Sequence, residues 1–291
     1  MVLPLVVGVD GSEAGLLAVD WAVDEAARLG LPLRLLYASL WELYEGAARQ
    51  EGPEGPAARV VPENILGPAA ERARSRNPEV GVSTSAVADD AVSVLLSESR
   101  NASALVTGAH GRGQVAGLLL GSVSLAVAAR AYCPVVVVRG DKAGLEGAHE
   151  RILLGVADPE ANSEAVRFAF RTAAARKCLL FVLRAWRRPS YTAADRSLPP
   201  GGSSRCWEER ASALLDAALH DAVADHPEVR VRRKTIEGPA RKVLLRHSAA
   251  ADLVIIGARR RHGHFGLQLS RVGHTLLHHA DCPVAIVPQL S

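Results

Sequence analysis

The chain has 291 residues, which at roughly 100–200 residues per domain predicts two domains. Hydrophobic residues make up 48% and charged residues 22%, as in ordinary soluble globular proteins, and a formal charge of +3 is too small to indicate a nucleic-acid partner. Aromatic residues are scarce at 4%, which argues against a base-stacking surface for single strands.

The first half of the chain alternates short apolar runs with amphipathic segments. The apolar runs predict five strands, near 3–9, 33–38, 80–87, 103–108 and 134–138. The amphipathic segments predict four helices, near 13–29, 63–76, 89–101 and 122–131. Nearly continuous apolar runs are typical of parallel strands covered on both faces. Repeated strand–helix units therefore predict an α/β fold with a doubly wound parallel sheet.

The second half repeats this order. Strands are expected near 151–156, 178–184, 229–236, 252–257 and 283–287. Helices are expected near 162–176, 205–225, 240–250 and 271–280. The chain is thus predicted to hold two tandem five-stranded domains.

An internal repeat supports the same division. The sequence ALVTGA at 104–109 matches LVIIGA at 253–258, and CPVVVV at 133–138 matches CPVAIV at 282–287. In both pairs the second copy follows the first by 149 residues. We therefore expect a first domain at 1–140, a Gly-rich linker at 141–150 and a second domain at 151–291.

A glycine-rich loop follows the fourth predicted strand of the first half and leads into a helix. Gly108 and Gly111 let backbone N–H groups approach a ligand without a Cβ in the way. Gly121 and Ser122 open the helix, whose free N–H groups and dipole favour an anion. The hydroxyls of Ser122 and Ser124 add donors. The loop lacks the Lys-Ser/Thr of a Walker A sequence, and it follows the fourth strand rather than the first, unlike a Rossmann fingerprint.

The spacing Gly-x2-Gly-x9-Gly-Ser resembles the ATP-binding signature of the universal stress protein family. The segment GVDGS at 8–12 resembles the first strand of that family, and CPVVV at 133–137 resembles its last strand. The resemblance covers almost the whole chain, as two tandem domains. It implies a Rossmann-like sheet of order 3-2-1-4-5 in each domain, in which strands 1 and 4 flank the switch point where open α/β sheets bind ligands.

The resemblance also assigns ligand-binding residues in the first domain. Asp10 and the backbone around Ala38 would hold adenine, Gly108 and His110 would approach the ribose, and Val9 would also belong to the nucleotide site. The phosphates would be held by the loop and the helix that follows it, at Gly111, Gly121, Ser122, Val123 and Ser124. The implied cofactor is ATP with Mg²⁺, and the implied role is in stress response. An alternative is that the glycines only turn the chain and that Ser122 only caps the helix.

The second copy departs from the signature. Arg260 stands at the position of Gly111, Ser270 at that of Gly121, and Arg271 at that of Ser122. A Cβ at 260 would hinder close backbone approach, and Arg271 removes a hydroxyl. We therefore expect the second site to bind ATP weakly or not at all, although the arginines at 259–261 offer side chains to an anion.

Three functional classes remain open from the sequence. The favoured class is an ATP-dependent sensor or regulatory binding protein. The family resemblance implies that its two domains pair through their last strands, with or without homodimer formation. The second class is a slow ATPase or self-phosphorylating enzyme, for which we find no nucleophile–base pair. The third class is a protein-interaction module that binds no nucleotide, or cyclic AMP.

Other signals have plainer interpretations. The four cysteines form no CxxC pair, so a zinc ribbon is not indicated. His274 and His278 lie four residues apart but lack the Glu of HExxH, so we expect no metal. The basic residues at 184–188 and 230–234 are interpreted as solvated surface. With no leader pattern and no apolar run near the roughly 20 residues that cross a bilayer, we expect a cytoplasmic protein.

Overall fold

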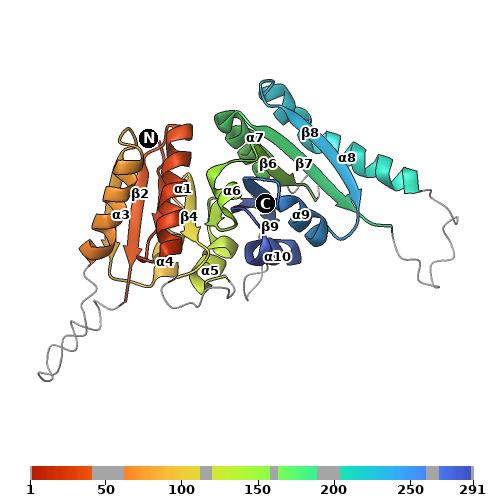
Figure 1. Ribbon diagram of the computed structural model, residues 1–291. Helices are drawn as coiled ribbons and strands as arrows, with labels where there is room; N and C mark the ends of the chain where they lie inside the picture. The colour runs from red at the N-terminus through yellow and green to blue at the C-terminus, as the bar shows by residue number, and fades with distance from the viewer. Residues whose placement is uncertain are drawn as a thin grey trace, which may run out of the picture. The chain divides into compact units, whose positions relative to one another are not determined.

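A computed structural model describes residues 2–40, 62–111, 120–157, 163–188, 204–259 and 269–289. The chain divides into two compact units, Met1–Arg139 and Gly140–Ser291 (Figure 1). Each unit is an open parallel sheet with helices packed on it. The described elements confirm the predicted α/β class, and most of their ends lie within three residues of the expected ones.

The sheet of the first unit confirms the expected strand order. Its strands follow the order β3-β2-β1-β4-β5, and all of their pairings are parallel. They are β1 Leu5–Gly8, β2 Leu33–Ala38, β3 Val82–Val87, β4 Ala104–Gly108 and β5 Val135–Val138. From β1 to β3 each new strand is added toward one edge of the sheet, whereas β4 and β5 are added on the other side of β1. The carboxyl ends of β1 and β4 therefore flank the switch point of the sheet.

Four helices of the described residues cover this sheet. They are α1 Glu13–Leu29, α3 Pro62–Arg76, α4 Ala91–Glu98 and α5 Ser122–Arg130. Helix α1 packs beside α3, and α4 packs beside α5. Right-handed crossovers place the first pair on one face and the second pair on the other. The helices that follow the two switch-point strands, α1 after β1 and α5 after β4, therefore lie on opposite faces of the sheet.

Helix α1 has clear start and stop signals. Ser12 caps its first turn, because its Oγ accepts a hydrogen bond from Gly15 N at 3.1 Å. Gly30 ends it in the left-handed conformation, with φ of 63°, which glycine adopts without strain. The helix buries a row of small and branched residues, together with Trp21, against the sheet.

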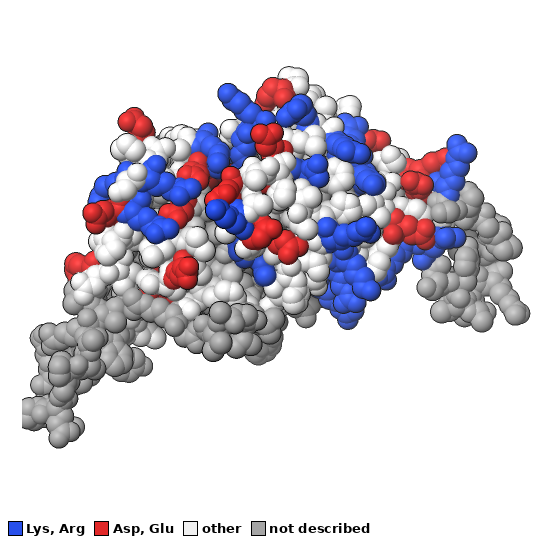
Figure 2. Space-filling view, in the orientation of Figure 1, with Lys and Arg blue, Asp and Glu red and all other residues white. Residues whose placement is uncertain are grey.

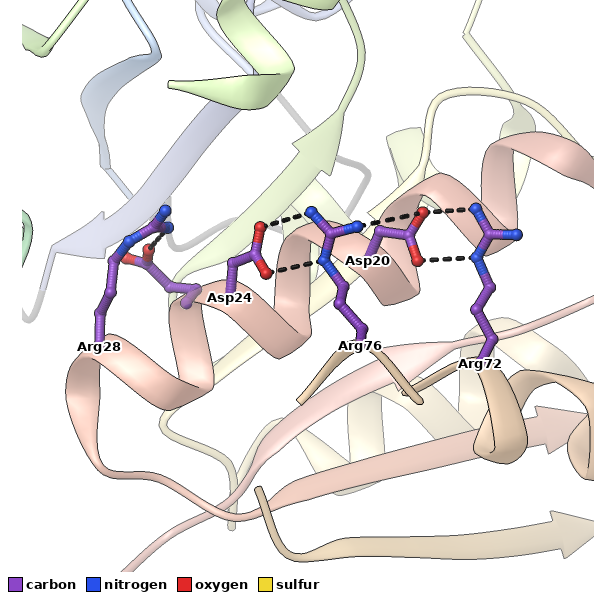
Figure 3. A network of polar contacts seen from close by, with 6 residues as sticks. Asp20, Asp24, Arg28, Arg72 and Arg76 are labelled. Atoms are coloured by element: carbon purple, nitrogen blue, oxygen red, sulfur yellow. Dashed lines mark hydrogen bonds and ion pairs between the residues drawn. The ribbon is translucent and has the colours of Figure 1, made fainter. Parts of the chain in front are cut away.

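Ion pairs join the outer faces of α1 and α3 (Figure 3). The guanidinium of Arg72 binds both carboxylate oxygens of Asp20, and that of Arg76 binds both oxygens of Asp24. Arg76 also lies 3.9 Å from Asp20, so the four side chains form one ladder. Bidentate pairs in a network are the surface ion pairs that contribute most to stability.

The second unit repeats the same architecture. Its strands follow the order β8-β7-β6-β9-β10, again with parallel pairings. They are β6 Arg151–Gly155, β7 Leu179–Trp186, β8 Val231–Glu237, β9 Leu253–Arg259 and β10 Val284–Gln289. Its main helices are α7 Ser163–Arg176, α8 Ser204–Asp225, α9 Ala240–Ser248 and α10 Arg271–His279.

The segment expected as a linker, 141–150, contains a short helix, α6 Lys142–Glu146. Asp141 caps it by accepting from Gly144 N at 2.8 Å, and Gly147 ends it with φ of 75°. The N–H of Asp141 donates to Asp281 O at 3.0 Å, which attaches the segment to the second unit. Five residues are too few to show helical periodicity, so the sequence did not indicate this helix.

Among the described helices, none is both long and apolar enough to cross a membrane.

Candidate functional site

A cavity of about 340 Å³ opens at the carboxyl ends of β1 and β4 in the first unit. Its volume falls at the lower end of the range of ligand pockets, roughly 300–1,000 Å³. All ten residues that the sequence assigned to ligand binding line it: Val9, Asp10, Ala38, Gly108, His110, Gly111, Gly121, Ser122, Val123 and Ser124. The fold therefore brings together residues that are more than 100 positions apart in the chain.

Six further described residues, which the sequence did not assign to ligand binding, also line the cavity. They are Gly8, Gly15, Leu36, Ala91, Leu95 and Thr107. Leu36, Ala91 and Leu95 give one part of the cavity an aliphatic wall, made by β2 and α4. Ala91 and Leu95 are four residues apart, so their spacing on a predicted helix is a signal that could have placed them on one face.

The first turn of α5 forms the polar part of the cavity. Gly121 is the N-cap residue and offers no side chain to cap the helix. The N–H groups of Ser122, Val123 and Ser124 have no acceptor among the described residues. Uncapped N–H groups at the positive end of a helix dipole make a favourable position for an anion.

The hydroxyl of Ser124 is used within the protein. Ser124 is 6% exposed, and its Oγ donates a hydrogen bond to the carbonyl oxygen of Gly108 at 2.8 Å. This bond ties α5 to the end of β4. We expected this hydroxyl to help hold phosphate, but its proton is committed to Gly108. Ser124 therefore offers a ligand its backbone N–H.

Asp10 organises the entry to α1. Its Oδ1 accepts from Ser12 N at 3.0 Å and from Ser12 Oγ at 2.6 Å. Its Oδ2 lies 2.9 Å from the position that a Cβ on Gly111 would take. A side chain at 111 would therefore collide with the Asp10 carboxylate. Because residue 111 has no side chain, it can lie close to Asp10, which follows β1.

Gly108 is required for a reason that the sequence did not reveal. A Cβ on Gly108 would lie 2.6 Å from both the carbonyl carbon and the carbonyl oxygen of Ala14, in the first turn of α1. Real Cβ contacts are essentially never that short. Gly108 also lines the cavity, and its expected role of making room for a ligand stays a prediction. The structure adds that it makes room for the backbone of α1, which packs across the end of β4.

The second unit differs at the start of the corresponding helix. Ser270 is the N-cap of α10, and its Oγ accepts a hydrogen bond from Gly273 N at 3.1 Å. A protein side chain thus satisfies a first-turn N–H that remains without a described acceptor in α5. The side chains of Arg259 and Arg260, which the sequence offered for anion binding, lie outside the described residues.

The floor of the second crevice is also more tightly filled. A Cβ on Gly155 would lie 2.9 Å from Leu244 Cδ1 and 3.1 Å from Ile256 Cγ2. The corresponding distances from Gly8 in the first unit are 3.3 Å to Leu95 Cδ1 and 3.7 Å to Thr107 Cγ2. The hollow above this glycine is therefore narrower in the second unit.

The second unit also carries histidine and basic side chains outside the region that corresponds to the cavity. The rings of His274 and His278 on α10 stack with centroids 6.3 Å apart. The described residues contain no group of three or more potential metal ligands. Of the basic residues near 184–188 and 230–234, Arg188 pairs with Glu237 and Arg233 with Asp216. On the face drawn in Figure 2, Lys and Arg are interspersed with Asp and Glu.

Comparison with known proteins identifies the family. The family model described as "Universal stress protein family" matches residues 1–139 and 149–288. The universal stress protein Rv2623 of Mycobacterium tuberculosis is 30% identical over 98% of this chain and 96% of its own length. The universal stress protein Rv2005c of the same species is 29% identical over 98% and 97%. A universal stress protein crystal structure from Archaeoglobus fulgidus superposes with a TM-score of 0.68, at 16% identity and 98% coverage of both chains. The chain therefore belongs to the universal stress protein family and carries two tandem copies of its domain.

Proposed function

We propose that the first unit binds ATP, and that the protein acts as a nucleotide-dependent regulatory binding protein. The observation that carries the proposal is the pairing of two different surfaces in one cavity. One part is aliphatic, from Leu36, Ala91 and Leu95, and suits a flat base. The other is the uncapped first turn of α5, which suits phosphate oxygens.

The residues around the cavity fit a nucleoside triphosphate better than a neutral ligand. The N–H groups at 122–124 are donors without a described acceptor, and an anion satisfies them together with the helix dipole. When bound, Mg²⁺ would neutralise part of the triphosphate charge. We propose that it arrives with the nucleotide, held by phosphate oxygens and water, as Mg²⁺ commonly is.

We propose further that the second unit binds ATP weakly or not at all. Ser270 already occupies Gly273 N, so a phosphate would have to displace an intramolecular hydrogen bond. The narrower hollow above Gly155 leaves less room for a base. One ATP per chain is the expected stoichiometry.

A regulatory role follows from binding linkage. A ligand that binds only the folded state stabilises it by RT ln(1 + [L]/Kd), which is about 2.7 kcal/mol when the ligand is at 100 times Kd. ATP at cellular excess would therefore favour the folded first unit and, among folded conformations, the one that binds ATP more tightly. A partner that contacts the residues around the cavity would sense the presence of nucleotide.

The test is calorimetric titration of nucleotide-stripped protein with ATP and Mg²⁺, with cyclic AMP and GTP titrated in parallel. The informative variant is Gly121→Ser, which gives α5 the N-cap residue of α10. A serine there would accept from Ser124 N and compete with phosphate, costing about 0.5–1.5 kcal/mol of binding free energy, roughly 2- to 10-fold in Kd. Gly121→Ala is the matched control, because a Cβ at 121 finds its nearest atom, Ala109 O, at 3.5 Å.

The outcomes separate the alternatives. One binding event per chain, weakened more by Gly121→Ser than by Gly121→Ala, supports ATP held at the helix start. Equal losses in the two variants would mean that bulk at 121, not capping, disturbs the ligand. Tighter binding of cyclic AMP than of ATP would reassign the ligand. No binding heat and no thermal protection with any nucleotide would refute the proposal and favour a protein-interaction module.

A further inference from the structure

Thr107 is the polar member of an otherwise apolar row on the floor of the cavity. The register of the sheet places Leu36 beside Gly8 and Thr107 beside Val137. Gly8 and Thr107 are the next positions along their strands after the paired Val7 and Val106. The row therefore crosses β2, β1, β4 and β5, and Leu95 of α4 lies above it.

The hydroxyl of Thr107 has no hydrogen bond. The residue is 4% exposed, and its Oγ1 is covered by protein and has no partner among the described residues. A buried hydroxyl left without a partner costs free energy that a valine of the same shape would not cost. Stability of the unit alone therefore gives no reason for a threonine at this position.

The other branch of the side chain points to a reason. The methyl Cγ2 of Thr107 lies 3.7 Å from the position that a Cβ on Gly8 would take, and both residues line the cavity. A 120° rotation about χ1 moves the hydroxyl of a threonine into the place of its methyl and moves the methyl into the place of the Cβ hydrogen. In that rotamer the hydroxyl faces the hollow and can donate to, or accept from, a bound ligand.

We propose that Thr107 is a specificity-determining residue that hydrogen-bonds to the base of the bound nucleotide. This inference rests on the nucleotide binding proposed above. The base is the relevant part because Gly8, beside Thr107, is paired with Leu36 and lies under Leu95, on the aliphatic wall of the cavity. Ring nitrogens and amino groups of a purine are partners of the kind a hydroxyl can satisfy.

The second unit provides an internal contrast. Ile256 occupies the position of Thr107, and its Cγ2 lies 3.1 Å from the position of a Cβ on Gly155. Ile256 brings no hydroxyl to this position and leaves less space above Gly155. The unit predicted to bind nucleotide poorly is thus also the one without the hydroxyl.

The test compares Thr107→Val and Thr107→Ser in the full chain. For each variant we would measure the Kd of ATP and the midpoint of thermal unfolding without nucleotide. We expect Thr107→Val to weaken ATP binding about tenfold, or ~1.4 kcal/mol, while raising the unfolding midpoint of the nucleotide-free protein. Thr107→Ser keeps the hydroxyl and should bind ATP within about twofold of wild type. Opposite changes in affinity and stability would not arise from a packing role.

A second ligand locates the contact. Ribose 5-triphosphate lacks a base, so Thr107→Val should bind it as wild type does. An equal loss for ATP and ribose 5-triphosphate would overturn the assignment to the base. Equal ATP affinity of wild type and Thr107→Val would overturn the role of Thr107 while leaving ATP binding intact. Failure of the wild type to bind ATP at all would overturn both proposals.

Discussion

The substitution Gly108→Ala tests whether the first turn of α1 and the end of β4 are in the close contact that the structure shows. The new Cβ would meet Ala14 C and O at 2.6 Å, whereas ordinary contacts are 3.4–4 Å. The backbone of α1 would have to move away by roughly 1 Å, because a carbonyl within a helix cannot rotate aside. Overpacking of this kind costs about 1–3 kcal/mol. We place the expected loss toward the upper end, because the contact is with backbone and not with a flexible side chain.

The assay is urea unfolding of Gly108→Ala and of the matched variant Gly121→Ala, followed by circular dichroism and tryptophan fluorescence. Trp21 on α1 is 5% exposed and is one of four tryptophans in the chain, so its emission reports on the helix that must move once the other three are replaced by phenylalanine in all variants compared. Gly121→Ala meets no described atom closer than 3.5 Å, and its cost should be limited to the poorer capping of α5 by alanine, about 0.5–1 kcal/mol. If Gly108→Ala were as stable as wild type, the proposed reason for this glycine would be wrong.

Three further predictions concern stability and reactivity. Pairwise removal of Arg72 and Asp20 in a double-mutant cycle should show a coupling of about 1 kcal/mol, which 1 M NaCl should largely remove, since both groups are partly exposed. The hydrogen bond from Ser93 N lowers the pKa of Asp90, the N-cap residue of α4. The Asp90 carboxylate therefore stabilises the folded state above its unfolded pKa, about 3.9, and this stabilisation is lost as the pH falls through the folded pKa. Asp90→Ala should therefore cost about 1 kcal/mol at pH 7 in urea unfolding, and the difference from wild type should shrink at pH 3. Burial raises the pKa of Cys133 to about 12 and also raises that of Cys282, and Cys178 is buried as well. Only Cys206 should therefore react quickly with a thiol reagent in the folded protein. Fast reaction of a second thiol would contradict the packing around these strands.

The strands and the cavity residues could be predicted from sequence because their signals are local or repeated. A continuous apolar run such as 134–138 predicts a covered parallel strand, and the repeat at 149 residues doubles the evidence for each element. Once the strand order follows from the family resemblance, Asp10 and Gly108 must meet at the same edge of the sheet. Strand ends were less accurate, as with β9, which extends to Arg259 instead of 257.

The contacts that a group makes across the fold could not be predicted. The sequence shows that Ser124 carries a hydroxyl but not that Gly108 O lies 2.8 Å away to accept its proton. It shows a glycine at 108 but not the carbonyl of Ala14 that forbids a side chain there. Thr107 looked like any β-branched strand residue until its neighbours were known to be apolar. Each of these depends on residues distant in the chain and on distances of a few tenths of an ångström.

The two units differ where a ligand would bind and agree where the fold needs a polar contact. Ser99 Oγ donates to Leu96 O and accepts from Tyr132 N. Ser248 Oγ does the same in the second unit, with Leu245 O and Asp281 N. These paired bonds connect the end of a helix to the turn before the last strand, and both copies retain them.

The cavity positions changed instead. Thr107 becomes Ile256, Gly121 becomes Ser270, Ser122 becomes Arg271 and Ser124 becomes Gly273. Ile256 fills the space above Gly155, and Ser270 supplies a protein acceptor for the N–H of Gly273 in the first turn of α10. A unit whose fold was failing would lose scaffold bonds such as that of Ser248 as readily as cavity residues. The second unit keeps its core and satisfies its own helix start, which is the arrangement expected of a domain that folds stably without a ligand.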